Sequence, residues 1–100
     1  MTKYRIVSEP RANLDVAAAF DWYENREPGL GKRFAEEVRA TFDRIAESPF
    51  AYQEIRSGIR RAIVRRFPYV VYFVVEPGEV VVLAVLHVNR DPKEWQRRRS

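Results

Sequence analysis

The side chains suited to acid–base or phosphate chemistry lie mainly in the second half of the chain. His87 is the single histidine, the side-chain type best suited to proton transfer near neutral pH. The arginines that accompany it are Arg60, Arg61, Arg65, Arg66 and Arg90. Metal-free RNA cleavage needs a base, an acid and cations around the charged phosphorane. If the chain is a nuclease, the candidate catalytic residues are therefore Arg65, His87 and Arg90.

A structural role is the preferred interpretation of His87. Alternation along a strand places this residue on the same side as Val81, Leu83 and Val85. A half-buried imidazole at the end of the strand would hydrogen-bond the backbone and orient the turn that leads to Arg90.

Alternation also divides the arginines of segment 59–67. In a regular strand, Arg61 and Arg65 share one face. Arg60 and Arg66 then lie on the other face, so Arg60 and Arg61 do not line one site together.

Composition excludes several functional classes. The 100 residues include no cysteine, which excludes disulfides, thiolate metal sites and a cysteine nucleophile. A single histidine excludes a His-pair metal site, and we expect neither a metal nor a cofactor. No apolar run approaches the roughly 18 residues of a membrane span, and the N-terminus lacks the apolar core of a signal peptide. We expect one domain over residues 1–100, in the cytoplasm and without a membrane partner.

Positive charge is concentrated in the second half of the chain. Residues 1–50 carry eight Lys and Arg against nine Asp and Glu, a net charge of −1. Residues 51–100 carry ten against five, a net charge of +5. This asymmetry favours a face for a polyanion or an acidic partner, with a merely solvated surface as the alternative.

Two helices are predicted in the first half. After a strand over residues 2–7, Ser8 is the expected N-cap and Pro10 lies in the first turn of a helix over about 11–27. Its apolar stripe comprises Leu14, Ala18 and Trp22, widened by Val16, Ala19, Phe20 and Tyr23. We expect Trp22 and Tyr23 in the core or in the seam between the helices.

The second helix is predicted over residues 30–47, after the break formed by Pro28 and Gly29. Its apolar residues recur at spacings of four and three: Leu30, Phe34, Val38, Phe42 and Ile45. Ser48 and Pro49 end the helix.

Three strands follow a loop through Gly58, over residues 59–67, 69–76 and 80–88. Pro77 and Gly78 supply a type II hairpin turn between the last two. The order β-α-α-β-β-β predicts a two-layer α+β fold, with a helical hairpin on one face of a mostly antiparallel four-stranded sheet. Segment 80–88 is apolar at almost every position, which is typical of a central strand covered on both faces. We expect the second face to be covered by the chain's own tail, a second copy or a partner.

Residues 89–100 form a basic C-terminal tail, in which Pro92 is placed to open a short helix. A basic hook of this kind would dock on a protein or a nucleic acid. The predicted target-binding residues are Arg60, Arg90, Trp95, Arg97 and Arg98. The alternative is a solvated, frayed terminus, with Trp95 packed back on the domain.

An ordered set of landmarks spans nearly the whole chain. It comprises Ala17 to Tyr23 (AAAFDWY), Pro28 to Gly31 (PGLG) with Phe34 and Val38, Pro49, Gly58 with Arg60, Phe67 to Tyr72 (FPYVVY), and His87 to Pro92 (HVNRDP) with Trp95. This set resembles the RelE/ParE superfamily of bacterial toxin–antitoxin toxins, specifically its ParE-like branch. The resemblance implies a toxin of a type II, plasmid-stabilisation-type system that forms a hetero-oligomer with its cognate antitoxin.

The two branches of this superfamily imply different targets. The ParE-like branch implies inhibition of DNA gyrase by binding, and the RelE-like branch implies cleavage of mRNA on the ribosome. RelE-like nucleases carry a Tyr or His close to the C-terminus, whereas the stretch after Arg90 in this chain, DPKEWQRRRS, has neither. The resemblance therefore favours a gyrase inhibitor, with the ribosome-dependent endoribonuclease as the alternative.

Overall fold

The computed structural model describes residues 3–99, with the backbone alone for Arg99. Thr2, where the first predicted strand begins, and Ser100, the end of the predicted tail, lie outside this range. The elements are β1 (Arg5–Ser8), α1 (Pro10–Arg26), α2 (Leu30–Glu47), η1 (Pro49–Ala51), β2 (Glu54–Arg56), β3 (Ile59–Ile63), β4 (Tyr69–Glu76), β5 (Glu79–His87), α3 (Pro92–Gln96) and η2 (Arg97–Arg99).

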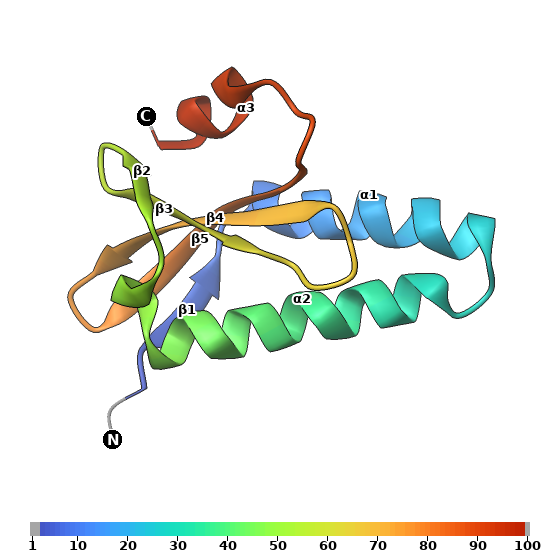
Figure 1. The fold of residues 1–100 in the computed structure, drawn as a ribbon, viewed down its shortest axis with the longest axis horizontal. Helices are drawn as coiled ribbons and strands as arrows, with labels where there is room; N and C mark the ends of the chain where they lie inside the picture. The colour runs from blue at the N-terminus through green and yellow to red at the C-terminus, as the bar shows by residue number, and fades with distance from the viewer. Residues whose placement is uncertain (1–2, 100) are drawn as a thin grey trace.

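The strands form one sheet in the order β1-β5-β4-β3-β2, in which β1 is parallel to β5 and the other neighbours are antiparallel. The helical hairpin α1–α2 covers one face, and the tail with α3 lies on the other side (Figure 1). The two-layer α+β class is confirmed, and β5 is an internal strand, as its apolar sequence predicts. Within residues 3–99, no helix combines the length and the apolarity needed to cross a membrane.

The sheet has one more strand than the sequence predicted. Glu54–Arg56 lies in the segment expected to be a loop, and it pairs with β3. Ser57 and Gly58 between them both have positive φ, 50° and 83°. Two such residues in a row form the tight turn that suits a β-hairpin. Strand β3 is also shorter than predicted, because it ends at Ile63 and Arg66 adopts a positive φ of 68°.

The second helix runs over Leu30–Glu47 with Ser48 at its C-cap, as predicted. The close approach of α1 and α2 depends on Gly31, where an added Cβ would lie 2.6 Å from the backbone oxygen of Phe20. The Glu24 carboxylate accepts hydrogen bonds from the backbone N–H groups of Gly29 (2.8 Å) and Gly31 (3.0 Å). This carboxylate satisfies amides at the start of α2 that have no partner within the helix.

The first helix differs from the sequence prediction at its start and on its buried face. Its N-cap is Glu9, because Ser8 is the last residue of β1 and pairs with Val82. The buried residues are Ala12, Ala19 and Tyr23. The predicted stripe of Leu14, Ala18 and Trp22 is instead exposed. The packed face of α1 is therefore rotated away from Leu14 and Trp22.

The second face of the sheet is covered by the chain's own tail. Its apolar cluster includes Val70, Tyr72, Leu83 and Leu86, all buried. Trp95 of α3 stacks on Tyr72, with ring centroids 5.3 Å apart and planes inclined by 15°. The sequence left three possibilities for this face: the chain's own tail, a second copy or a partner. The structure shows the tail packed on it.

A β-bulge in β5 changes which residues face the helices. Tyr72 pairs with Ala84 and Phe73 with Val82, so Leu83 is an extra residue in β5. Leu83 therefore packs on the tail side with Ala84 and Leu86, whereas Val85 belongs to the helix-side core. The prediction that Val81, Leu83 and Val85 share one side with His87 was wrong for Val81 and Leu83, because it assumed unbroken alternation.

Candidate functional site

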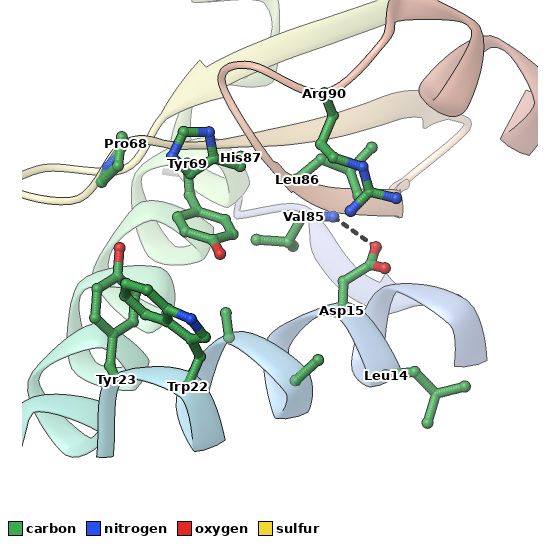
Figure 2. A pocket seen from close by; sticks show the side chains of 12 residues that line it. Leu14, Asp15, Trp22, Tyr23, Pro68, Tyr69, Val85, Leu86, His87 and Arg90 are labelled. Carbon is green, nitrogen blue, oxygen red and sulfur yellow. Dashed lines mark hydrogen bonds between the residues drawn. The ribbon is translucent and has the colours of Figure 1, made fainter. Parts of the chain in front are cut away.

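A groove of about 600 Å³ runs between α1 and the adjoining ends of β4 and β5 (Figure 2). Its lining combines apolar side chains from α1 with polar groups from the two strands and the turn that follows them. The lining residues are Leu14, Asp15, Ala18, Ala19, Trp22, Tyr23, Pro68, Tyr69, Val85, Leu86, His87 and Arg90. We refer to this site as the α1 groove.

Two large apolar side chains on the α1 side of the groove are exposed to solvent. Leu14 is 69% exposed and Trp22 is 51% exposed. The Arg26 guanidinium lies 4.2 Å from the Trp22 ring centroid, a cation–π contact that orients the indole. The expectation that Trp22 belongs to the core or to the helix seam was wrong. Tyr23 does belong to the core, where its ring contacts Phe34, Phe67 and Tyr69.

Asp15, which lines the groove, forms an ion pair that joins α1 to the tail. Arg98 donates two hydrogen bonds to the Asp15 carboxylate, at 3.0 and 3.1 Å, and their side chains are 6% and 14% exposed. Arg98 also donates to the Leu83 carbonyl (2.9 Å), and Asp15 accepts from the Val85 N–H (3.0 Å). Because β1 ends opposite Val82, β5 has β4 on one edge here but no strand on the other, and these two side chains bond the backbone of that open edge instead.

His87 lies at the end of β5, and its ring is engaged with the backbone. Its Nδ1 accepts a hydrogen bond from the Asn89 N–H (3.0 Å), and its carbonyl accepts one from the Arg90 N–H (3.0 Å). The Tyr69 ring meets the imidazole edge-on at 5.4 Å. The accepting Nδ1 leaves Nε2 to carry the proton of the neutral ring. In this arrangement the imidazole orients the turn that places Arg90 on the rim.

Two phenols in the lining of the groove are held in their protonated form. Burial raises the pKa of Tyr69, while Arg90 acts to lower it and Asp15 to raise it. Burial, with a smaller contribution from Tyr69, also raises the pKa of Tyr23. Both hydroxyls therefore remain neutral hydrogen-bonding groups at physiological pH. Among residues 3–99, no three His, Asp or Glu side chains gather as metal ligands would.

The structure brings two of the three candidate nuclease residues together. His87 and Arg90 line the α1 groove, whereas Arg65 lines a separate hollow with Arg44 and Arg61. Arg65 follows the end of β3, so its position no longer obeys the strand alternation on which its placement relied.

The predicted target-binding residues have different surroundings. Arg60 is largely buried, and it donates to the Tyr52 carbonyl (2.6 Å) and pairs with Glu54 (3.7 Å). Arg98 is buried in its ion pair, and Trp95 is stacked on the sheet. Arg90 and Arg97 are exposed.

Sequence reasoning missed residues that shape the α1 groove and the separate hollow that Arg65 lines. Asp15 was not singled out, and Leu14 was placed on the apolar stripe of its helix, whereas it is the most exposed large apolar side chain described. Arg61, rather than Arg60, is the exposed member of its pair. The sequence signal that could have indicated this is Ile59, which packs in the cluster on the tail side of the sheet. Residues two apart in a strand share a face, so Arg61 lies on that side as well.

This fold is that of the RelE/ParE superfamily toxins. Residues 6–92 match the family described as the ParE toxin of the type II toxin–antitoxin system parDE. The chain belongs to the ParE toxin family, which confirms the resemblance drawn from the sequence.

Two solved structures share the architecture. A chain of a chromosomal ParDE system from P. aeruginosa matches with a TM-score of 0.76 at 16% identity, over 85% of this chain and 96% of that one. A chain of the toxin–antitoxin complex RelBE2 from Mycobacterium tuberculosis matches with a TM-score of 0.62 at 22% identity, over 87% of this chain and 93% of that one. These likenesses support the fold. No curated protein matches the sequence significantly.

Proposed function

We propose that this type II toxin acts in the cytoplasm by binding DNA gyrase, and that a cognate antitoxin neutralises it by covering the α1 groove. The observation that carries the proposal is the ParE family match over residues 6–92. The two similar structures come from systems described as ParDE and RelBE2, which supports a hetero-oligomer with an antitoxin for this chain as well.

The α1 groove has the chemistry of a protein-binding site. Leu14 and Trp22 present apolar surface that no other part of the described chain covers. Arg90 on the rim has a half-exposed side chain that pairs with Glu94, at 3.3 Å. An antitoxin segment with apolar anchors and one acidic residue beside Arg90 would complement this surface.

Binding of purified antitoxin by calorimetry tests the groove. Burying a Leu- or Trp-sized side chain contributes about 1.5–3 kcal/mol. Leu14→Ala and Trp22→Ala should therefore each weaken binding about 10- to 100-fold. Ile63→Ala is the matched control, because Ile63 is 57% exposed but lies on β3, away from the groove. Equal losses for the groove variants and the control would contradict this location.

Gyrase inhibition by binding, without chemistry, is supported by the state of His87. Its Nδ1 is occupied by the Asn89 N–H, and Arg65 lies in a different hollow. His87→Gln keeps a hydrogen-bond acceptor on the side chain. This variant should inhibit supercoiling by purified gyrase as strongly as the wild type.

The alternative is a ribosome-dependent endoribonuclease that uses Arg65, His87 and Arg90. It is favoured by one observation: His87, Arg90 and the Tyr69 phenol line the same groove. Primer extension on translated mRNA would then show codon-phased cuts that His87→Ala abolishes. Intact message during growth arrest would contradict this alternative.

A further inference from the structure

We propose that a second surface of this toxin, formed by five arginines, binds the phosphodiester backbone of a nucleic acid. We refer to it as the arginine surface, and it consists of Arg44, Arg56, Arg61, Arg65 and Arg90. It lies on β2, β3 and the ends of α2 and β5, and four of the five arginines lie outside the α1 groove.

The arginine surface is built around two adjoining hollows. One, of about 470 Å³, is lined by Arg44, Tyr52, Gln53, Arg61, Ala62, Ile63 and Arg65. The other, of about 390 Å³, is lined by Ile55, Arg56, Arg61, Tyr72, Val88, Arg90, Pro92, Trp95 and Gln96. Arg61 lines both, which makes the surface continuous. Neither lining contains an aspartate or a glutamate.

Three exposed arginines outside this surface have carboxylate partners, whereas on the surface only Arg90 is shown with one in the described part of the chain, Glu94 at 3.3 Å. Arg5, Arg33 and Arg66 are exposed but pair with Glu79, Glu27 and Glu37, at 2.9–3.0 Å. Among residues 3–99, the structure shows no carboxylate paired with Arg56, Arg61 or Arg65. Unneutralised guanidinium groups gathered around a hollow produce a positive potential that attracts anions.

The composition of this surface favours a nucleic acid over an acidic protein as its ligand. All five cations are arginines, whose planar donors match phosphate and carboxylate groups alike in a bidentate manner, so the preference for a nucleic acid rests on the overall charge and on the neighbouring aromatic pair. The chain has a sequence pI of about 9.8, and five of its arginines line two adjoining hollows, a basic patch of the kind that nucleic-acid-binding domains carry. The Tyr72–Trp95 stack next to Arg61 adds an aromatic edge for contacts with sugars or bases.

The test is fluorescence anisotropy with a labelled 20-base-pair DNA duplex and a labelled 20-nucleotide single-stranded RNA, at several salt concentrations. The double variant Arg61→Ala/Arg65→Ala should bind at least tenfold more weakly. For the duplex, the slope of log K against log salt should fall in magnitude by about 2, because two phosphate contacts are lost. Binding of only one of the two probes supports the proposal and identifies the source of the phosphates.

The matched control is Arg11→Ala/Arg39→Ala, which removes the same charge from exposed positions on α1 and α2 outside both hollows. It should keep most of the affinity. Two results would overturn the proposal: equal losses in both double variants, or poly-glutamate of matched charge competing as well as the nucleic acids. The assay contains no gyrase or antitoxin, so its outcome is independent of the function proposed above. Circular dichroism of each variant checks folding.

Discussion

Removal of Arg98 should detach the tail and destabilise the domain. Loss of one partner from a buried ion pair costs about 3–5 kcal/mol. In this case Asp15 is 14% exposed and keeps its bond from the Val85 N–H, which leaves its carboxylate partly satisfied. The tail can also detach without global unfolding, which limits the loss. We therefore expect Arg98→Ala to lower the free energy of unfolding by about 2–4 kcal/mol.

The assay combines urea unfolding with the fluorescence of Trp95. In a Trp22→Phe background, Trp95 is the only indole, and it reports directly on the stack with Tyr72. Arg98→Ala should lower the urea midpoint and shift the native emission to longer wavelength as the indole becomes hydrated. Arg97→Ala, one residue earlier and exposed, is the control and should cost no more than about 1 kcal/mol. If Arg98→Ala leaves both midpoint and emission unchanged, the ion pair does not hold the tail.

Two further predictions concern packing and pH. Gly31→Ala should destabilise the domain by about 1–3 kcal/mol in urea unfolding, because its Cβ would lie 2.6 Å from the Phe20 carbonyl oxygen and the hairpin must shift. An unchanged urea midpoint in Gly31→Ala would refute the close-approach argument. Gly78→Ala, whose Cβ meets no neighbour but whose φ is 72°, should cost about 1–2 kcal/mol from backbone strain alone. Burial raises the pKa of Tyr72 despite the opposing effect of Arg61, so the folded state holds the phenol proton more tightly than the unfolded state. The stabilisation from burying the neutral Tyr72 phenol is therefore present below about pH 10 and is lost as the pH rises through the raised pKa. Urea midpoints at pH 9 and pH 11.5 should differ less in Tyr72→Phe than in the wild type, and an equal difference would contradict this assignment.

Helix α2 and strand β4 were predicted to the residue, and strand β5 to within one residue at each end, because these parts of the chain carry strong local signals. Helix α2 has apolar residues at spacings of four and three and is bounded by Gly29 and Ser48. The β4–β5 hairpin has Pro77 and Gly78 at the two positions where a type II turn requires them, and Gly78 has a φ of 72°. These signals depend only on neighbouring residues, so no tertiary contact overrides them.

The buried face of α1 was predicted poorly, because its apolar residues surround much of the helix. Three consecutive alanines are compatible with either the buried or the exposed face of a helix. The small side chains of Ala12 and Ala19, both buried, allow the sheet to approach α1 closely. The larger Leu14 and Trp22 then remain outside. This arrangement creates the α1 groove, which the sequence pattern alone did not indicate.

The bulge at Leu83 and the role of Arg98 were also beyond the sequence. Segment 80–88 is apolar at almost every position, so no alternation marks the extra residue. The bulge leaves the Leu83 carbonyl for a side chain to bond, and Arg98 supplies the donor. In the sequence Arg98 is one of three consecutive arginines, and only the path of the tail distinguishes it from its neighbours.

The measurement that tests the central claim most directly is a supercoiling titration with purified gyrase, relaxed plasmid and increasing toxin. The account predicts saturable inhibition, unchanged for His87→Gln and reversed when antitoxin is added in equimolar amount. Complete supercoiling at a large molar excess of folded toxin would contradict it.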